Sequence, residues 1–112
     1  MKIGNQLEQG TIVGPLHSQA AVDLYRSTIE KAVQQGGKIL VGGNVLKGPG
    51  NFVEPTLIRI SPDAEIIKTE AFVPISYVME YSDLDQAIQY NNNVSQGLSS
   101  ALFTNQVSFP IY

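Results

Sequence analysis

The chain has 112 residues, of which 43% are hydrophobic and 15% are charged, and its formal net charge is −3. This length suits a single domain, and the composition can form a hydrophobic core, which excludes an intrinsically disordered chain. Seven basic against ten acidic side chains argue against a nucleic-acid partner, because duplex binding needs clustered Lys and Arg. The absence of cysteine excludes disulfides, thiolate metal sites and a cysteine nucleophile within these residues.

Two further features of the composition limit the kind of site and the location. The single histidine, His17, cannot form a His-rich zinc site within one chain, so no metal centre is expected. The apolar runs are only a few residues long and cannot span a bilayer, and the N-terminus lacks the apolar stretch of a secretory signal. We therefore expect no membrane partner and an intracellular location, which is cytoplasmic or alternatively mitochondrial.

Residues 1–16 predict an irregular arm, because turn-forming residues recur at Gly4, Gly10, Gly14 and Pro15. A helix is expected over 18–35, with Ser18 as the N-cap whose hydroxyl accepts a hydrogen bond from a free N–H of the first turn. The apolar positions that follow recur every three or four residues, which is the spacing of one helix face. Gly36 and Gly37 end the helix, since glycine adopts the left-handed conformation at the least cost.

Short β-segments are expected after the helix. Lys38–Val41 is predicted to form a strand that ends at a pair of glycines. The segment 52–60 is rich in β-forming residues, but Pro55 has no N–H to donate, so ladder pairing is expected from about Thr56. Residues 64–69 are expected to form one short helical turn.

The last third of the chain predicts a strand–helix–strand unit. A strand over 75–81 is followed by a helix that Ser82 caps, with Asp85 completing a capping box, and then by a strand over 98–104. Two strands joined in this way run parallel with a right-handed crossover. The residues of the first strand that share one face are Ile75, Tyr77, Met79 and Tyr81.

Together these elements predict an α/β fold with a mostly parallel sheet and two helices, in a single partial domain that occupies residues 1–112. Pro110 argues against a helix at the C-terminal end. The small number of strands would leave apolar surface uncovered. The chain is therefore predicted to be one piece of a larger domain.

Few residues suggest chemistry on their own. The glycine pairs match no phosphate-binding motif and are interpreted as turns. The neighbours His17 and Ser18 suggest a base and a nucleophile, but no orienting acid is evident, so Ser18 is interpreted as a cap. Glu70 precedes Phe72 and Pro74 in a loop, where a carboxylate can accept two sugar hydroxyls while a ring covers a flat heterocycle. The alternative to such a binding site is an acidic residue in a loop beside a phenylalanine of the core. The residues taken alone favour this alternative.

A series of short segments, taken in order over residues 3–105, resembles the aldehyde dehydrogenase superfamily and most of all its antiquitin branch. That branch is similar to α-aminoadipic semialdehyde dehydrogenase. The loop Thr69–Pro74 resembles the E-x-F-x-P loop of the superfamily. The other segments that carry the resemblance are Ile3–Leu7 (in which Gln6 replaces the usual proline), Gly14–Leu16, Gly36–Gly43, Phe52–Leu57, Tyr90–Asn92 and Gly97–Thr104.

This family oxidises aldehydes to carboxylic acids, so the resemblance implies NAD as the cofactor, with NADP as the alternative. It implies that Glu70 bonds the hydroxyls of the nicotinamide ribose and that Phe72 packs near the nicotinamide. It also implies that the chain is the C-terminal part of a catalytic domain, whose partners are an aldehyde, the remainder of that domain and other subunits. The branch implies α-aminoadipic semialdehyde as the candidate substrate.

The departures from the family pattern restrict what the chain does alone. The nucleophilic cysteine is absent, the general-base glutamate would belong to an upstream part, and residues 106–112 diverge from the family's continuing helix. We therefore assign no catalytic residue to this chain and expect no turnover by it alone. The alternative function is a non-catalytic interaction module that keeps the fold and binds another chain through its apolar face. A hydrolase that uses Ser18 and His17 is the least favoured interpretation.

Overall fold

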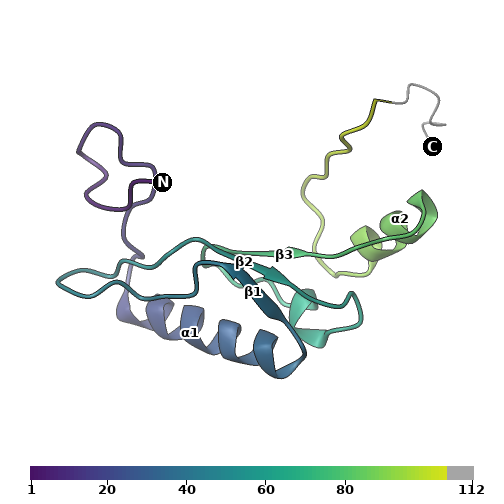
Figure 1. Ribbon diagram of the computed structural model, residues 1–112, viewed down its shortest axis with the longest axis horizontal. Helices are drawn as coiled ribbons and strands as arrows, with labels where there is room; N and C mark the ends of the chain where they lie inside the picture. The colour runs from purple at the N-terminus through teal and green to yellow at the C-terminus, as the bar shows by residue number, and fades with distance from the viewer. Residues whose placement is uncertain (106–112) are drawn as a thin grey trace.

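The computed structural model describes residues 1–105, which form a small three-stranded sheet with a long helix packed on one face (Figure 1). The α/β class with two helices is thereby confirmed. In chain order the elements are the helix α1 (Gln19–Gln34), the strands β1 (Lys38–Val41) and β2 (Thr56–Arg59), the 3₁₀ turn η1 (Glu65–Lys68), the strand β3 (Ile75–Val78) and the helix α2 (Leu84–Asn92). The divergent tail predicted for 106–112 lies outside the described residues.

The predicted first helix is confirmed, and both of its ends have the local chemistry that a helix needs. The Ser18 Oγ accepts a hydrogen bond of 3.2 Å from the Ala21 N–H. At the other end the Gly37 N–H donates to the Ala32 carbonyl at 2.8 Å and the Gly36 N–H donates to the Val33 carbonyl at 3.0 Å. This pair of bonds is a Schellman motif, and the positive φ of 88° at Gly36 is the left-handed conformation that it requires.

The hydrophobic core lies between α1 and the sheet. Tyr25 and Ala32 on α1 and Ile58 on β2 are fully buried, because β2 is the central strand and α1 runs across its face. The buried members of this core are Val22, Tyr25, Ile29, Ala32, Val53, Ile58, Ile60 and Ala64. The 3.6-residue spacing of the apolar side chains of α1 therefore corresponds to the buried face, as expected.

The sheet is mixed, whereas a mostly parallel sheet was expected. Its order is β1-β2-β3, in which β2 and β3 are parallel and β1 and β2 are antiparallel. The antiparallel pairing follows from the connection: residues 42–55 form an excursion that reverses the chain and contains an isolated bridge between Val45 and Val53. Ladder pairing of the second strand begins at Thr56, directly after Pro55, as predicted.

The second helix is confirmed, but its predicted cap is wrong by one residue. Asp83 is the N-cap, and its carboxylate accepts from the Gln86 N–H at 2.9 Å. The side chain of Gln86 in turn accepts from the Ser82 N–H at 2.8 Å. Aspartate caps as well as serine does, and Gln86 can reach back to the backbone before the helix.

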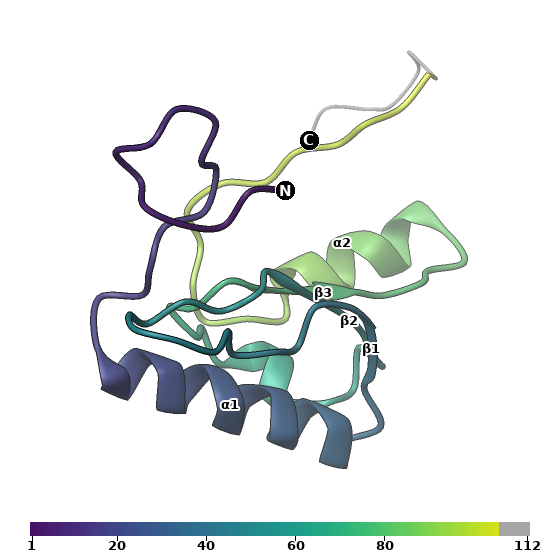
Figure 2. The ribbon, with the colours of Figure 1, turned by 60° about the vertical axis from the view of Figure 1, so that its left-hand side comes forward.

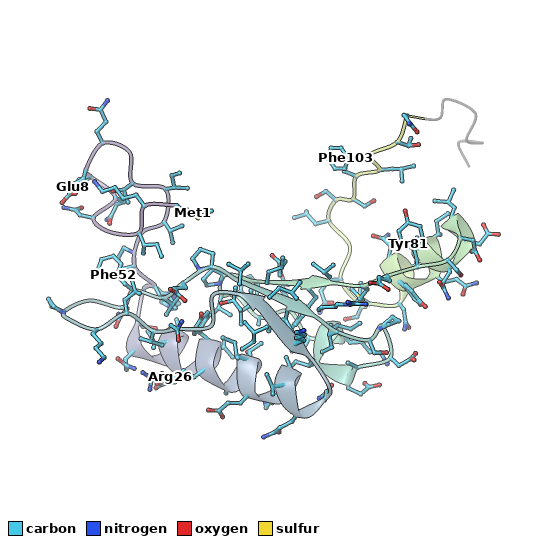
Figure 3. The ribbon with its side chains drawn as sticks, in the orientation of Figure 1. Met1, Glu8, Arg26, Phe52, Tyr81 and Phe103 are labelled. Atoms are coloured by element: carbon cyan, nitrogen blue, oxygen red, sulfur yellow. The ribbon has the colours of Figure 1, made fainter. Side chains whose placement is uncertain are left out.

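The predicted strand over 98–104 is wrong for the described part of the chain. The segment forms no strand within the described residues, and Leu98 and Phe103 on it are almost completely exposed. Figure 3 shows Phe103 on a stretch of chain that rises away from the sheet. A strand forms only where a second strand satisfies its N–H and C=O groups, and none lies beside this segment within residues 1–105. The right-handed crossover is therefore not completed here.

Two segments project from the side of the sheet opposite α1: the arm of residues 1–16 and the segment 98–105, as both ribbon views show (Figure 1 and Figure 2). The arm is held by its own bonds, which include the 3.0 Å bond from the Gly4 N–H to the Val13 carbonyl and an ion pair between Lys2 and Glu8. The radius of gyration is 16.5 Å, against about 13 Å for a compact domain of this length. Neither helix in residues 1–105 is long and apolar enough to cross a membrane.

Candidate functional site

The loop Thr69–Pro74, between η1 and β3, carries both residues singled out by the sequence. Its first residue is fixed to η1, because the Thr69 N–H donates to the Ile66 carbonyl at 3.2 Å. Its last residue is fixed to the sheet, because the Pro74 carbonyl accepts from the Thr56 N–H at 2.9 Å. The loop is thus short and bonded to the fold at both ends.

Two tight turns stiffen the loop internally. The Val73 N–H donates to the Ala71 carbonyl at 2.6 Å, and the Ile75 N–H donates to the Val73 carbonyl at 2.7 Å. Each bond spans two residues, which defines a γ-turn, with Phe72 at the centre of the first turn and Pro74 at the centre of the second. Proline suits the second turn because its φ is already fixed near the value that an inverse γ-turn uses. The sequence-based expectation of a loop made rigid by proline is thus supported by its bonds.

Phe72 is not a core residue. Its side chain is 79% exposed, and Glu70 is exposed as well. The interpretation favoured by these residues alone, a loop acid beside a core phenylalanine, is therefore wrong. Burying a phenylalanine side chain contributes about 1.5–3 kcal/mol to the free energy of unfolding. The exposed Phe72 ring makes no such contribution. The ring face is accessible to a flat partner, and the carboxylate two residues earlier is accessible to hydroxyl donors.

Glu70 and Phe72 do not both line the hollow beside the loop. Glu70 lines an open hollow of about 410 Å³ where its loop meets β3 and the turn after α2. Phe72 does not line it. The walls of this hollow are formed by Ile67, Thr69, Glu70, Ala71, Ile75, Tyr77, Val94 and Gln96.

Tyr77 is the feature of this hollow that sequence reasoning missed as a site residue. Its Oη is buried and has no hydrogen-bond partner among the described residues. Burial raises the pKa of the Tyr77 phenol, because the charged form loses water. The alternation of apolar residues in the predicted strand placed Tyr77 on the inner face, but it did not show that Tyr77 and Glu70 would line the same hollow.

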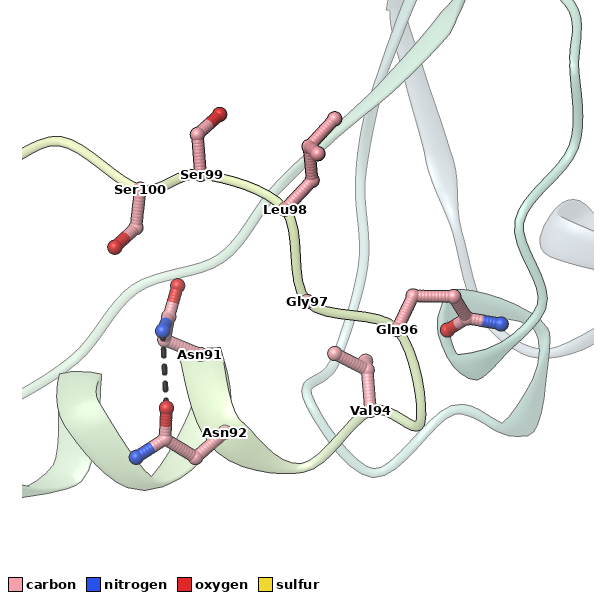
Figure 4. Close-up of a pocket in the computed structure, with 8 residues that line it drawn as sticks. All are labelled: Asn91, Asn92, Val94, Gln96, Gly97, Leu98, Ser99 and Ser100. Carbon is pink, nitrogen blue, oxygen red and sulfur yellow. Dashed lines mark hydrogen bonds between the residues drawn. The ribbon is translucent and has the colours of Figure 1, made fainter.

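A second hollow of about 410 Å³ lies at the C-terminal end of α2 (Figure 4). It is lined by amide, hydroxyl and apolar groups, and the Asn91 side chain donates to that of Asn92 at 3.1 Å. Its lining residues are Asn91, Asn92, Val94, Gln96, Gly97, Leu98, Ser99 and Ser100. None of these groups titrates near neutral pH, so this hollow offers no acid–base chemistry.

The pair His17 and Ser18 does not form a nucleophilic site. The Ser18 Oγ is used as the helix cap, and His17 is exposed in the turn before it. No group of three His, Asp or Glu side chains within residues 1–105 is placed to hold a metal ion. The loop Thr69–Pro74 therefore remains the candidate site.

This loop fits one part of a nicotinamide nucleotide. A carboxylate can accept hydrogen bonds from both ribose hydroxyls, and an exposed ring can cover a flat heterocycle. The glycines Gly42, Gly43, Gly48 and Gly50 all have positive φ, and they lie in the excursion between β1 and β2 and not before a helix. These glycines therefore offer no helix N-terminus to a phosphate.

The model of the aldehyde dehydrogenase family matches residues 1–109. The chain belongs to this family. The resemblance to this family drawn from the short segments is thereby confirmed, and two relatives bear out its antiquitin branch. The chain is similar to aldehyde dehydrogenase family 7 member A1 of Pisum sativum, with 53% identity over 96% of this chain and 21% of that protein. It is also similar to the α-aminoadipic semialdehyde dehydrogenase of Bos taurus, with 41% identity over 93% of this chain and 20% of that protein.

Solved structures of the family agree with this fold. An NAD⁺ complex of the aldehyde dehydrogenase of Bacillus cereus superposes with a TM-score of 0.87 at 30% identity, over 95% of this chain and 22% of that one. Aldehyde dehydrogenase 21 of Physcomitrella patens, in complex with the reaction product succinate, superposes with a TM-score of 0.84 at 37% identity, over 96% of this chain and 22% of that one. The chain thus spans about a fifth of the length of the relatives it matches.

Proposed function

We propose that the chain supplies the nicotinamide-riboside part of the cofactor surface in an NAD(P)-dependent aldehyde dehydrogenase. The observation that carries this proposal is the exposure of Glu70 and Phe72 on a loop that two γ-turns and two anchoring bonds hold rigid. A rigid loop binds with a smaller loss of conformational entropy, so it suits a site that must hold a ligand in one orientation. The NAD⁺ complex of the Bacillus cereus relative supports the class of cofactor.

In this proposal each of the two residues has one task. The nicotinamide group, when bound, accepts a hydride as the aldehyde is oxidised to the acid. The Glu70 carboxylate accepts hydrogen bonds from the two hydroxyls of the adjoining ribose, which fixes the rotation of the sugar. The Phe72 ring covers one side of the nicotinamide and keeps water from it. NAD is the proposed cofactor, and NADP is the alternative.

The proposed substrate is α-aminoadipic semialdehyde, supported by the name of the Bos taurus relative. The chain contains no cysteine, so it holds no thiolate that could attack this aldehyde. We therefore propose that the nucleophile comes from outside these 112 residues and that the purified chain alone has no turnover. Aldehyde-dependent NADH production by the purified chain, lost in Glu70→Gln, would overturn this part.

The cofactor role is tested in a chimera in which this chain replaces the matching 108 residues of the Pisum sativum relative. Glu70→Gln removes the charge from the acceptor, and hydrogen bonds to charged groups contribute about 1.5–3 kcal/mol. We expect the KM for NAD to rise about 10- to 100-fold while the KM for the aldehyde stays unchanged.

The matched control for this experiment is Glu30→Gln, which makes the same chemical change on the exposed face of α1. It should leave both constants unchanged. An equal effect of the two substitutions, or no effect of Glu70→Gln on the KM for NAD, would contradict the proposed role of Glu70.

The second candidate function is the interaction module, and the exposed segment 98–105 favours it. Leu98 and Phe103 on this segment are 101% and 95% exposed. Groups of this kind are normally covered by another chain or by another part of the same one. A monodisperse homo-oligomer of the purified chain that gives no response to NAD would favour the module over the enzyme fragment.

A further inference from the structure

Two hydrogen-bonded routes connect the site loop Thr69–Pro74 to the helix α1 and its C-cap. One route passes from the C-terminal end of the loop through β2 to Tyr25. The other passes from the N-terminal end of the loop through η1 to Gln35, the residue that ends α1. Both Tyr25 and Gln35 lie far from Glu70 and Phe72 in the sequence, and no motif singled them out.

The first route is a buried hydrogen-bond cluster. The Thr56 Oγ1 lies 2.7 Å from the Tyr25 Oη, accepts from the Gly43 N–H at 2.9 Å and donates to the Glu54 carbonyl at 2.9 Å. Tyr25 is fully buried and Thr56 is 4% exposed, so these bonds are shielded from water. The cluster fixes the backbone of Thr56, whose N–H donates to the Pro74 carbonyl at the end of the loop.

The second route is a single bond at the surface. The Gln35 Oε1 accepts from the Ile66 N–H at 2.9 Å, and this bond joins η1 to the end of α1. The Ile66 carbonyl then accepts from the Thr69 N–H, where the loop begins. Within residues 1–105, no other side-chain hydrogen bond joins η1 to α1 or its C-cap.

We propose that Tyr25 and Gln35 are positioning residues that hold the two ends of the site loop at a fixed separation along α1. Their positions differ by ten along α1 and its C-cap, which corresponds to a rise of about 15 Å. This inference rests on the proposed function for the role of Glu70 and Phe72, but the mechanical link itself does not depend on a nucleotide. Loss of either attachment should loosen the loop without unfolding the core.

The link is tested first in the 112-residue chain without nucleotide, by amide hydrogen exchange. Gln35→Ala removes the acceptor of one bond, so exchange at the amides of Ile66 and Thr69 should accelerate about five- to tenfold. Gln34→Ala is the matched control, since Gln34 is the neighbouring glutamine and is also exposed. Gln35→Glu keeps an acceptor oxygen and should restore slow exchange.

Tyr25→Phe tests the other attachment. It removes only the hydroxyl, and exchange at Thr56 should accelerate by a similar factor. Tyr81→Phe is its control, because Tyr81 is 59% exposed and lies beyond β3. Acceleration that spreads evenly over the whole core, or that is equal in variant and control, would overturn the proposal.

The consequence for binding is tested in the chimera. Gln35→Ala and Tyr25→Phe should each raise the KM for NAD about three- to tenfold, with rescue by Gln35→Glu and no change in the KM for the aldehyde. If Glu70→Gln raises this KM and neither positioning variant does, the positioning proposal is overturned. If exchange accelerates as expected but Glu70→Gln has no effect, the mechanical link stands and the proposed function fails.

Discussion

Thr56 shows how one buried hydroxyl can join three parts of the chain. Its Oγ1 contacts the helix through Tyr25, the turn after β1 through Gly43 and the strand entry through Glu54. Burial is the largest cause of the raised pKa of Tyr25, and it outweighs the hydrogen bonds that favour the phenolate. The neutral phenol is therefore the form that the folded chain requires.

This requirement predicts a dependence of stability on alkaline pH. The raised pKa means that the folded chain holds its phenolic proton at a pH where the unfolded chain, with an ordinary pKa of 10.0, releases it. Stability should be constant up to about pH 10 and should fall above it, by at most about 1.4 kcal/mol per pH unit for each such tyrosine. The measurement is urea unfolding from about pH 8 to about pH 12.

Tyr25→Phe should lower the free energy of unfolding at neutral pH. It should also make the loss of this free energy above about pH 10 less steep. A residual fall should persist in the variant, because burial also raises the pKa of Tyr77. An alkaline fall as steep in Tyr25→Phe as in the parent chain would show that Tyr25 is not its source.

At the scale of elements, the two glycines after α1 have different reasons to be glycine. Gly36 has a φ of 88° and open space around the position of a Cβ. Gly37 has no such φ, but a Cβ there would lie 2.7 Å from the Ala32 carbonyl oxygen and 3.0 Å from the Ile58 Cγ2. The first is a requirement of the backbone and the second a requirement of packing between α1 and β2.

Alanine at these two positions should therefore cost stability by different routes. Gly36→Ala places a side chain at positive φ, which costs about 1–2 kcal/mol. Gly37→Ala forces α1 away from β2, and overpacking of this kind costs about 1–3 kcal/mol and should also shift the NMR signals of the Ile58 methyl groups. Gly97→Ala is the control, because a Cβ at this position would have no neighbouring heavy atom within 4 Å. Chemical denaturation of the three variants checks the prediction, and equal losses in all three would refute it.

The elements that could be predicted from the sequence are those whose causes are local. Ser18, the glycine pair and the spacing of apolar residues define α1, and Pro55 marks where β2 begins to pair. The segment 98–104 has the composition of a strand, but a strand also depends on a neighbour that these residues do not contain. The site divides in the same way: Glu70 and Phe72 could be located from a local motif, whereas Tyr77 and Gln35 depend on contacts between distant parts of the chain.

At the scale of the whole molecule, the core is confined to the space between α1 and the sheet. The arm of residues 1–16 and the segment after α2 extend beyond it, which accounts for overall dimensions of 50 × 35 × 24 Å. The chain spans about a fifth of the length of its relatives, and we propose that these exposed surfaces meet the remainder of a longer protein.

The exposed segment 98–105 predicts self-association of the purified chain. Substituting Leu98→Ser and Phe103→Ser together removes two large apolar groups from it, so the average mass at high concentration should fall towards that of a monomer. Sedimentation across a range of concentrations measures this. Leu7→Ser is the control, because Leu7 is 87% exposed but lies in the arm. Association that Leu7→Ser weakens as much as the double substitution does would show that the segment has no special part in it.

The attachment of both ends of the site loop to α1 and its C-cap also restricts how this sequence can diverge. An inserted or deleted residue between Tyr25 and Gln35 would turn one end of the helix by about 100° relative to the other and shift it by about 1.5 Å. Gln35 would then leave the Ile66 N–H while Tyr25 kept its place in the core. Related chains are therefore free to exchange residues on the solvent face of this helix, but they should keep its length.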